Sequence, residues 1–175
     1  ETGAGISYTM AKMLHGSGVS AIDVGGLGGT SLAAAEIYRA NAEGDELGAH
    51  LGNLFGWDWG ISTVESIVEC RALPFTIPII ATGGIRNGLD IAKGIALGSD
   101  MCSAALPFLK PAMESGSIKS SVDKVVAKIR EFSEELKVAM FLTGCKNTID
   151  LKDAELVITG ETREIMEQRG VFDRV

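Results

Sequence analysis

The strongest candidate for chemistry is a glycine pair between an apolar run and a helix. The run at 77–82 has the unbroken apolar character of a strand buried on both faces. It ends at Gly83 and Gly84, and Asn87 can then cap a helix over 89–97. A strand, a glycine turn and a helix N-terminus present free N–H groups to an anion, usually a phosphate. The alternative is a plain strand-to-helix turn that binds no ligand.

Two further groups fit an anion or a planar ligand. Arg86 follows the glycine pair and could contact a phosphate through its backbone N–H, its guanidinium or both. Without an anion it would be an exposed arginine whose charge opposes the helix dipole. The loop 25–31 contains four glycines, so its backbone can lie flat against a ligand edge while Thr30 donates a hydrogen bond.

The other polar candidates form no recognisable catalytic set. We expect His15 at a helix C-terminus and His50 in a long polar loop, so neither is assigned to catalysis. No nucleophile–base pair can be named from the sequence. The acidic residues at 36–58 show no metal-ligand spacing, and Trp57 and Trp59 are expected to anchor their loop.

Composition excludes several function classes. The chain has 175 residues and a net charge of −7, which argues against nucleic acid or an anionic membrane surface as a partner. No apolar run reaches membrane-spanning length, and no signal peptide is recognisable. Three cysteines without metal spacing indicate reduced thiols in a cytoplasmic protein. The first residues resemble the end of a strand-to-helix loop, so we expect the C-terminal part of a longer protein.

Helix–glycine–strand units repeat along the chain and predict a parallel α/β architecture. Helices are expected near 6–14, 33–38 and 62–72, strands at 19–24 and 100–106, and an irregular segment at 41–59. The repeat does not choose between a doubly wound sheet and a barrel. In a barrel, however, the loops after the last two strands usually bind phosphate. The loops at Gly83 and Leu106 would then occupy those places.

The chain changes character after Pro107. A long amphipathic helix is expected from about 122 to 142, followed by a last helix at 161–168. We therefore divide the chain into residues 1–110, part of a barrel, and residues 111–175, a helical extension that packs on the barrel or on a partner subunit.

Five short stretches together resemble the flavin-dependent, type II isopentenyl-diphosphate isomerases. They are ETGAGIS at 1–7, IDVGGLGGTS at 22–31, DWGI at 58–61, ATGGIRNGLD at 81–90 and ALPFL at 105–109. The resemblance covers nearly the whole chain and corresponds to the later half of that family's barrel.

The resemblance implies a fold, a reaction and partners. The fold is the C-terminal part of a TIM-type (β/α)8 barrel that binds FMN, with a C-terminal helical extension. The reaction interconverts isopentenyl diphosphate and dimethylallyl diphosphate, with reduced FMN as the acid–base group. The family also implies NADPH as a reductant, Mg²⁺ with the diphosphate, and a homo-tetramer or octamer.

The resemblance also assigns site residues. Those implied to hold the FMN phosphate, mainly through backbone N–H groups, are Gly84, Ile85, Arg86, Ala105 and Leu106. Thr30 is implied to contact the ribityl or phosphate portion, and Gly83 shapes the turn. No catalytic or metal-binding residue is assigned within the chain.

Two departures from the family matter. Gly25 stands where the family usually has a serine that touches FMN. The family's substrate and Mg²⁺ segment, its N-terminal Arg-Lys pair and a flavin-contacting lysine before Glu1 are absent from this chain. We therefore expect that the chain exposes barrel interior and does not isomerise anything without the missing N-terminal half of the barrel.

Two other functions stay open. One is another FMN-dependent barrel oxidoreductase, similar to a 2-hydroxy-acid oxidase. That family places a proton-abstracting histidine in a late loop, whereas residues 51–175 contain none. The other is a non-catalytic phosphate-binding or assembly module, which a folded, monomeric, flavin-free chain would favour.

Overall fold

Three parallel strands form the centre of the molecule. The computed structural model describes residues 4–114 and 116–174, so the expectation for residues 1–3 lies outside the described part. The strands β1 (Ile22–Asp23), β2 (Ile79–Thr82) and β3 (Met101–Ser103) lie in the order β1-β2-β3. Ile22 is paired with Ile79, and Ile80 with Met101. Parallel neighbours joined through helices confirm the predicted α/β class.

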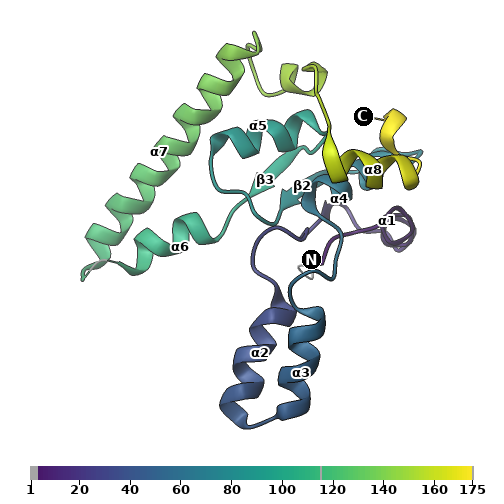
Figure 1. Cartoon of the computed structure of the whole chain (residues 1–175). Coiled ribbons are helices and arrows are strands. Elements are labelled where there is room, and N and C mark those ends of the chain that lie inside the picture. The colour runs from purple at the N-terminus through teal and green to yellow at the C-terminus, as the bar shows by residue number, and fades with distance from the viewer. Residues whose placement is uncertain (1–3, 115, 175) are drawn as a thin grey trace.

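Helices connect the strands and extend beyond them (Figure 1). Those up to the last strand are α1 (Tyr8–Gly16), α2 (Leu32–Glu43), α3 (Glu46–Phe55), α4 (Thr63–Arg71) and α5 (Gly88–Ala96). After β3 come α6 (Leu106–Met113), α7 (Ile118–Leu142), the 3₁₀ helix η1 (Asp150–Asp153), α8 (Gly160–Gln168) and the 3₁₀ helix η2 (Phe172–Arg174).

The sheet is covered on one face only. Ile22, Ile79 and Ala81 are buried and share a core with Ile67 and Val68 of α4. The alternate residues of the strands, which point to the other face, are partly or fully exposed. The prediction that the 77–82 run is buried on both faces is therefore wrong for this chain. In a complete barrel this exposed face of the sheet would point into the barrel interior, and the chain contains only part of the barrel.

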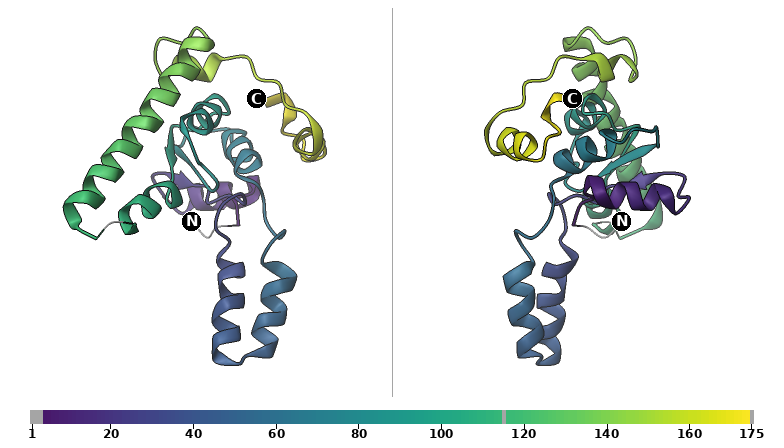
Figure 2. Two further views of the ribbon diagram at one scale, coloured as in Figure 1. Left: turned by 60° about the vertical axis from the view of Figure 1, so that its left-hand side comes forward. Right: turned by 90° about the vertical axis from the view of Figure 1, so that its right-hand side faces the viewer.

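The segment 41–59, expected to be irregular, contains the end of α2 and all of α3. Asp45 caps α3 by accepting from the Gly48 N–H at 2.9 Å, and Gly44 makes the tight turn between the helices with a φ of 74°. The two helices pack on each other as a hairpin that projects away from the sheet (Figure 2). His50 therefore lies on a helix rather than in a loop.

The other expected elements differ mainly at their ends. The first helix begins at Tyr8 because Ser7 caps it, and the first strand is shortened to Ile22–Asp23. The strand expected over 100–106 ends at Ser103, since α6 begins at Leu106. Ser62 and Glu65 form the predicted capping box of α4, and Asn87 caps α5 as expected.

The C-terminal helices pack back on the earlier part of the chain. α7 lies along α5 and α6, and Met166 and Val171 are buried in the core beneath α4. Arg169 forms an ion pair of 2.6 Å with Glu69, which is only 3% exposed. The expected division after residue 110 falls inside α6. None of the described helices is both long enough and apolar enough to cross a membrane.

Candidate functional site

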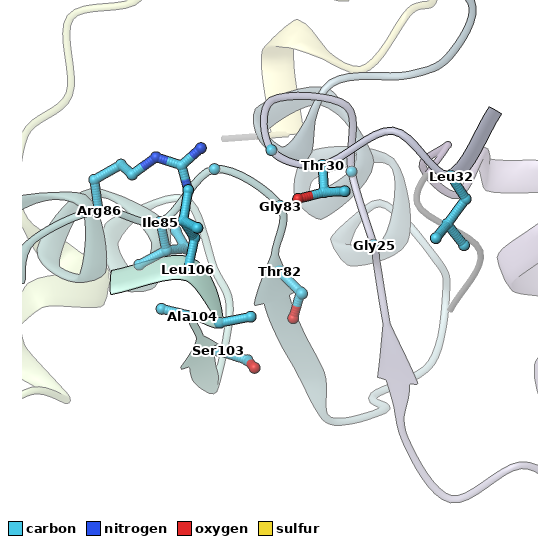
Figure 3. Close-up of a pocket in the computed structure, with 14 residues that line it drawn as sticks. Gly25, Thr30, Leu32, Thr82, Gly83, Ile85, Arg86, Ser103, Ala104 and Leu106 are labelled. Carbon is cyan, nitrogen blue, oxygen red and sulfur yellow. The ribbon is translucent and has the colours of Figure 1, made fainter. Parts of the chain in front are cut away.

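One cavity lies at the carboxyl ends of the three strands (Figure 3). Its volume is about 210 Å³, below the roughly 300–1,000 Å³ of a complete small-molecule site, so it can hold only part of a ligand. It is lined by Gly25, Gly26, Gly29, Thr30, Leu32, Thr82, Gly83, Gly84, Ile85, Arg86, Ser103, Ala104, Ala105 and Leu106. The structure thus brings all the expected site residues to one cavity, from the loops after β1, β2 and β3.

The loops after β1 and β2 touch each other through their backbones. A Cβ atom on Gly83 would lie 2.0 Å from the Gly26 carbonyl oxygen, and one on Gly84 would lie 2.4 Å from that of Gly28. Both Gly83 and Gly84 also have positive φ, at 109° and 82°. Side chains at either position would force the loops apart, so the sequence needs glycine here.

Four of the backbone N–H groups that belong to residues lining the cavity have no partner among the described residues. Within residues 4–114 and 116–174, the N–H groups of Gly84, Ile85, Ala105 and Leu106 donate to no protein acceptor. The last two belong to the N-terminus of α6, where Ala105 provides no side-chain cap. A helix N-terminus with open N–H groups carries a partial positive charge that attracts anions.

The side chain of Arg86, and not its backbone N–H, is open to a ligand. Its N–H already donates to the Asp90 carboxylate at 2.9 Å, and the Asp90 N–H donates to the Asn87 side chain at 2.8 Å. The expected backbone contact from Arg86 to a phosphate is therefore not available in this arrangement. The residue is exposed, and its guanidinium forms no hydrogen bond or ion pair with the described residues. Figure 3 shows Arg86 beside Ile85 and Leu106.

Opposite Arg86, Thr30 is exposed at the cavity with a hydroxyl free of described protein partners (Figure 3). Gly25, at a φ of 46°, donates its N–H to Asp23 at 3.1 Å. The same carboxylate accepts a hydrogen bond from the Thr82 hydroxyl at 3.0 Å. Sequence analysis did not single out Asp23 or Thr82. The sequence feature that could have identified them is a polar residue at the end of each otherwise apolar strand.

The remaining sequence candidates lie away from the cavity. His15 is at the end of α1, as expected, and stacks on Phe75 with ring centroids 3.6 Å apart. Burial, helped by the Glu69 charge, raises the pKa of the Cys70 thiol to about 12. Trp59 is 70% exposed and meets the Phe55 ring edge-on. Among the described residues, no three of His, Cys, Asp and Glu are placed to hold a metal ion.

Comparison with solved structures agrees with the fold. A GMP reductase variant from Trypanosoma brucei matches with a TM-score of 0.60 and 21% identity, over 89% of this chain and 34% of that one. A mandelate oxidase variant, solved with benzaldehyde, matches with a TM-score of 0.51 and 20% identity, over 88% of this chain and 45% of that one. These matches concern the fold alone. The chain is part of a TIM-type (β/α)8 barrel with a C-terminal helical extension, as predicted.

Sequence comparison defines the family. The profile of the FMN-dependent dehydrogenases matches residues 11–158, and the chain belongs to that family. Among curated proteins it is similar to the isopentenyl-diphosphate delta-isomerase of Methanosarcina barkeri, at 55% identity over 97% of this chain. The protein of that name from Archaeoglobus fulgidus is 51% identical, again over 97% of this chain. The chain spans 44% and 46% of the lengths of these two relatives. The resemblance seen in the sequence is confirmed.

Proposed function

We propose that the cavity binds the phosphate end of FMN. The observation that carries this is the set of four open N–H groups, from Gly84, Ile85, Ala105 and Leu106, on two neighbouring loops beside one cavity. The Arg86 guanidinium supplies the balancing positive charge. The Thr30 hydroxyl contacts the ribityl chain or the phosphate, and Gly83 shapes the turn. The residues present fit the group, because open backbone N–H groups and a guanidinium are the donors that a phosphate accepts from.

The protein to which this chain belongs is proposed to interconvert isopentenyl diphosphate and dimethylallyl diphosphate. The support is the name shared by relatives that are 51% and 55% identical, together with membership of an FMN-dependent family. Reduced FMN, when bound, supplies an acid–base group for the double-bond shift. This chain contributes the anchor for the cofactor. None of the residues lining the cavity is an aspartate, glutamate, histidine, lysine or cysteine, so the lining supplies no proton-transfer side chain itself.

Other features of the active protein are proposals from the same resemblance. Mg²⁺ accompanies the diphosphate and is bound by residues outside this chain, while NADPH reduces the flavin. The first half of the barrel completes the site, and the chain alone is inactive. Residues 111–175 act as an extension that packs on the barrel or on a partner subunit in a cytoplasmic homo-tetramer or octamer. Nucleic acid and membrane are not partners.

A second candidate is an oxidoreductase acting on a 2-hydroxy acid. The family profile that matches is named for dehydrogenases, which favours it. Against it stands the lack of any histidine in residues 51–175, where such enzymes need a base in a late loop. The isomerase is therefore the preferred proposal.

The test uses a completed barrel, in which this chain is fused to the part of the Methanosarcina barkeri relative outside the matched stretch. The purified protein should carry a flavin absorption spectrum and, once reduced by NADPH with Mg²⁺ present, form dimethylallyl diphosphate, followed by proton NMR. The parent relative serves as the positive control. A folded, purified fusion protein that shows no flavin absorption would overturn the cofactor assignment. Bound flavin with oxidation of a 2-hydroxy acid, and without isomerisation, would select the second candidate.

A further inference from the structure

Thr63 contacts the glycine turn without lining the cavity. It is the first residue of α4 and only 8% exposed. Its hydroxyl group lies 2.7 Å from the carbonyl oxygen of Gly83 and 3.1 Å from that of Thr82, and donates to this pair of acceptors. Thr63 does not line the cavity beside Gly84 and Arg86. Any effect on a ligand there must act through the backbone.

The residues just before α4 also hold the other glycine loop. The Thr63 N–H donates to the Leu27 carbonyl at 3.2 Å, and the Leu27 N–H donates to the Ile61 carbonyl at 2.9 Å. Ser62 and Leu27 form an isolated parallel bridge between these contacts. Thr63 therefore connects the loop after β1 to the loop after β2, although the two are far apart in the sequence.

The contact from the Thr63 hydroxyl fixes the direction of one of the open N–H groups, that of Gly84. In a trans peptide the C=O and N–H bonds point to opposite sides of the same rigid unit. Because Thr63 holds the Gly83 carbonyl, the Gly84 N–H of the same peptide points away from Thr63, and Gly84 lines the cavity that Thr63 does not line. Gly83 and Gly84 have no side chains to restrain this peptide, so an external donor is needed to fix it.

We propose that Thr63 is a positioning residue for the cofactor phosphate, and that it gives the site its preference for a phosphorylated flavin. This rests on the proposed FMN site. The phosphate gains from an N–H group that is already aimed at it, because no free energy is then spent on ordering the turn. The isoalloxazine and ribityl parts of the ligand lie beyond this peptide and gain little. Thr63 thus acts on the affinity for FMN and not on that for riboflavin.

The test compares the dissociation constants of FMN and riboflavin, measured by quenching of flavin fluorescence on the completed barrel. Thr63→Val keeps the shape and removes the hydroxyl donor. It should weaken the affinity for FMN roughly tenfold, the scale of one hydrogen bond to a charged group. The affinity for riboflavin should change by no more than about twofold. Thr63→Ser keeps the hydroxyl and should restore most of the preference for FMN.

Ser66→Ala is the matched control on the same helix. The Ser66 hydroxyl is buried and accepts from the Ile6 N–H at 3.0 Å, away from the turn. Its loss should lower the melting temperature without changing the ratio of the two dissociation constants. Equal weakening of FMN and riboflavin by Thr63→Val, or an unchanged FMN affinity, would overturn the role of Thr63 alone. Failure of the unaltered barrel to bind FMN would overturn the proposed site and this role together.

Discussion

The backbone N–H of Arg86 donates to the carboxylate of Asp90 at 2.9 Å. This places an acidic side chain four residues after the arginine, at the start of α5, where a carboxylate offsets the partial positive charge of the helix. It also leaves the guanidinium as the part of Arg86 that can meet an anion. The cavity therefore has two kinds of donor, the neutral backbone N–H groups and a single positive side chain.

Reversal of that charge is the most direct test of the phosphate site. Arg86→Glu in the completed barrel should abolish FMN binding, because it puts a second negative charge beside the phosphate. Arg86→Gln should weaken FMN by about 1.5–3 kcal/mol, the range for hydrogen bonds to charged groups. Fluorescence titration measures both. Arg39→Glu, on the projecting hairpin, should change nothing, and FMN affinity that survives Arg86→Glu would remove Arg86 from the site.

Removal of the Thr30 hydroxyl should have a smaller effect. Thr30→Ala is expected to weaken FMN by ~1 kcal/mol, the value of one neutral hydrogen bond, while Thr30→Ser keeps the affinity. The exposed Thr76→Ala is the control. If Thr30→Ala binds FMN as tightly as the unaltered protein in the same titration, Thr30 makes no contact with the ligand.

Gly29 lies where a side chain would cover the Gly84 N–H. A Cβ atom at Gly29 would be 2.8 Å from the Gly84 nitrogen, and no positive φ forbids alanine there. Because the atom that this Cβ would meet belongs to the backbone, Gly29→Ala should displace the Gly84 peptide, lower the melting temperature and lose at least tenfold in FMN affinity. Gly16→Ala adds a Cβ with nothing within 4 Å and should preserve both properties. Unchanged FMN affinity in Gly29→Ala would contradict a role for the Gly84 N–H.

Local signals in the sequence identified most elements of the fold. Ser62 with Glu65, and Asn87, marked helix starts correctly because capping depends on a few consecutive residues. α3 was missed because Gly48 and Gly52 lower its helix propensity. A Cβ on Gly52 would meet Ile37 of α2 at 2.6 Å, so the glycine allows a close packing of helices that no local pattern reveals.

In the candidate site too, features made by consecutive residues could be predicted from the sequence, whereas contacts between distant residues could not. The turn at Gly83 and Gly84 could be recognised because strand, glycine pair and helix cap are adjacent in the chain. The hydrogen bond from Thr82 to Asp23 joins residues 59 positions apart, and that from Thr63 to Gly83 spans 20. Such contacts depend on how parallel strands line up, which the sequence pattern alone does not fix.

Asp100 joins three elements at the other end of the sheet. Its carboxylate accepts hydrogen bonds from Lys152 at 2.5 Å, from Arg71 at 2.8 Å and from the Ile79 N–H at 2.9 Å. Burial by itself would raise the pKa of Asp100, but these donors outweigh it and lower the pKa to about 2. Protonation of the Asp100 carboxylate would remove most of this interaction. The contacts that join the ends of α4, β2 and η1 therefore depend on the negative charge of Asp100.

The lowered pKa sets the pH range in which Asp100 stabilises the protein. The stabilisation is fully present above the unfolded pKa of about 3.9 and is lost as the pH falls toward 2. The side chain is 34% exposed, so screening leaves about 1 kcal/mol. Asp100→Asn should lower the melting temperature at pH 7, and the difference from the unaltered protein should shrink between pH 4 and pH 2. The exposed Asp153→Asn serves as control, and a difference that persists at pH 2 would show that packing rather than charge is responsible.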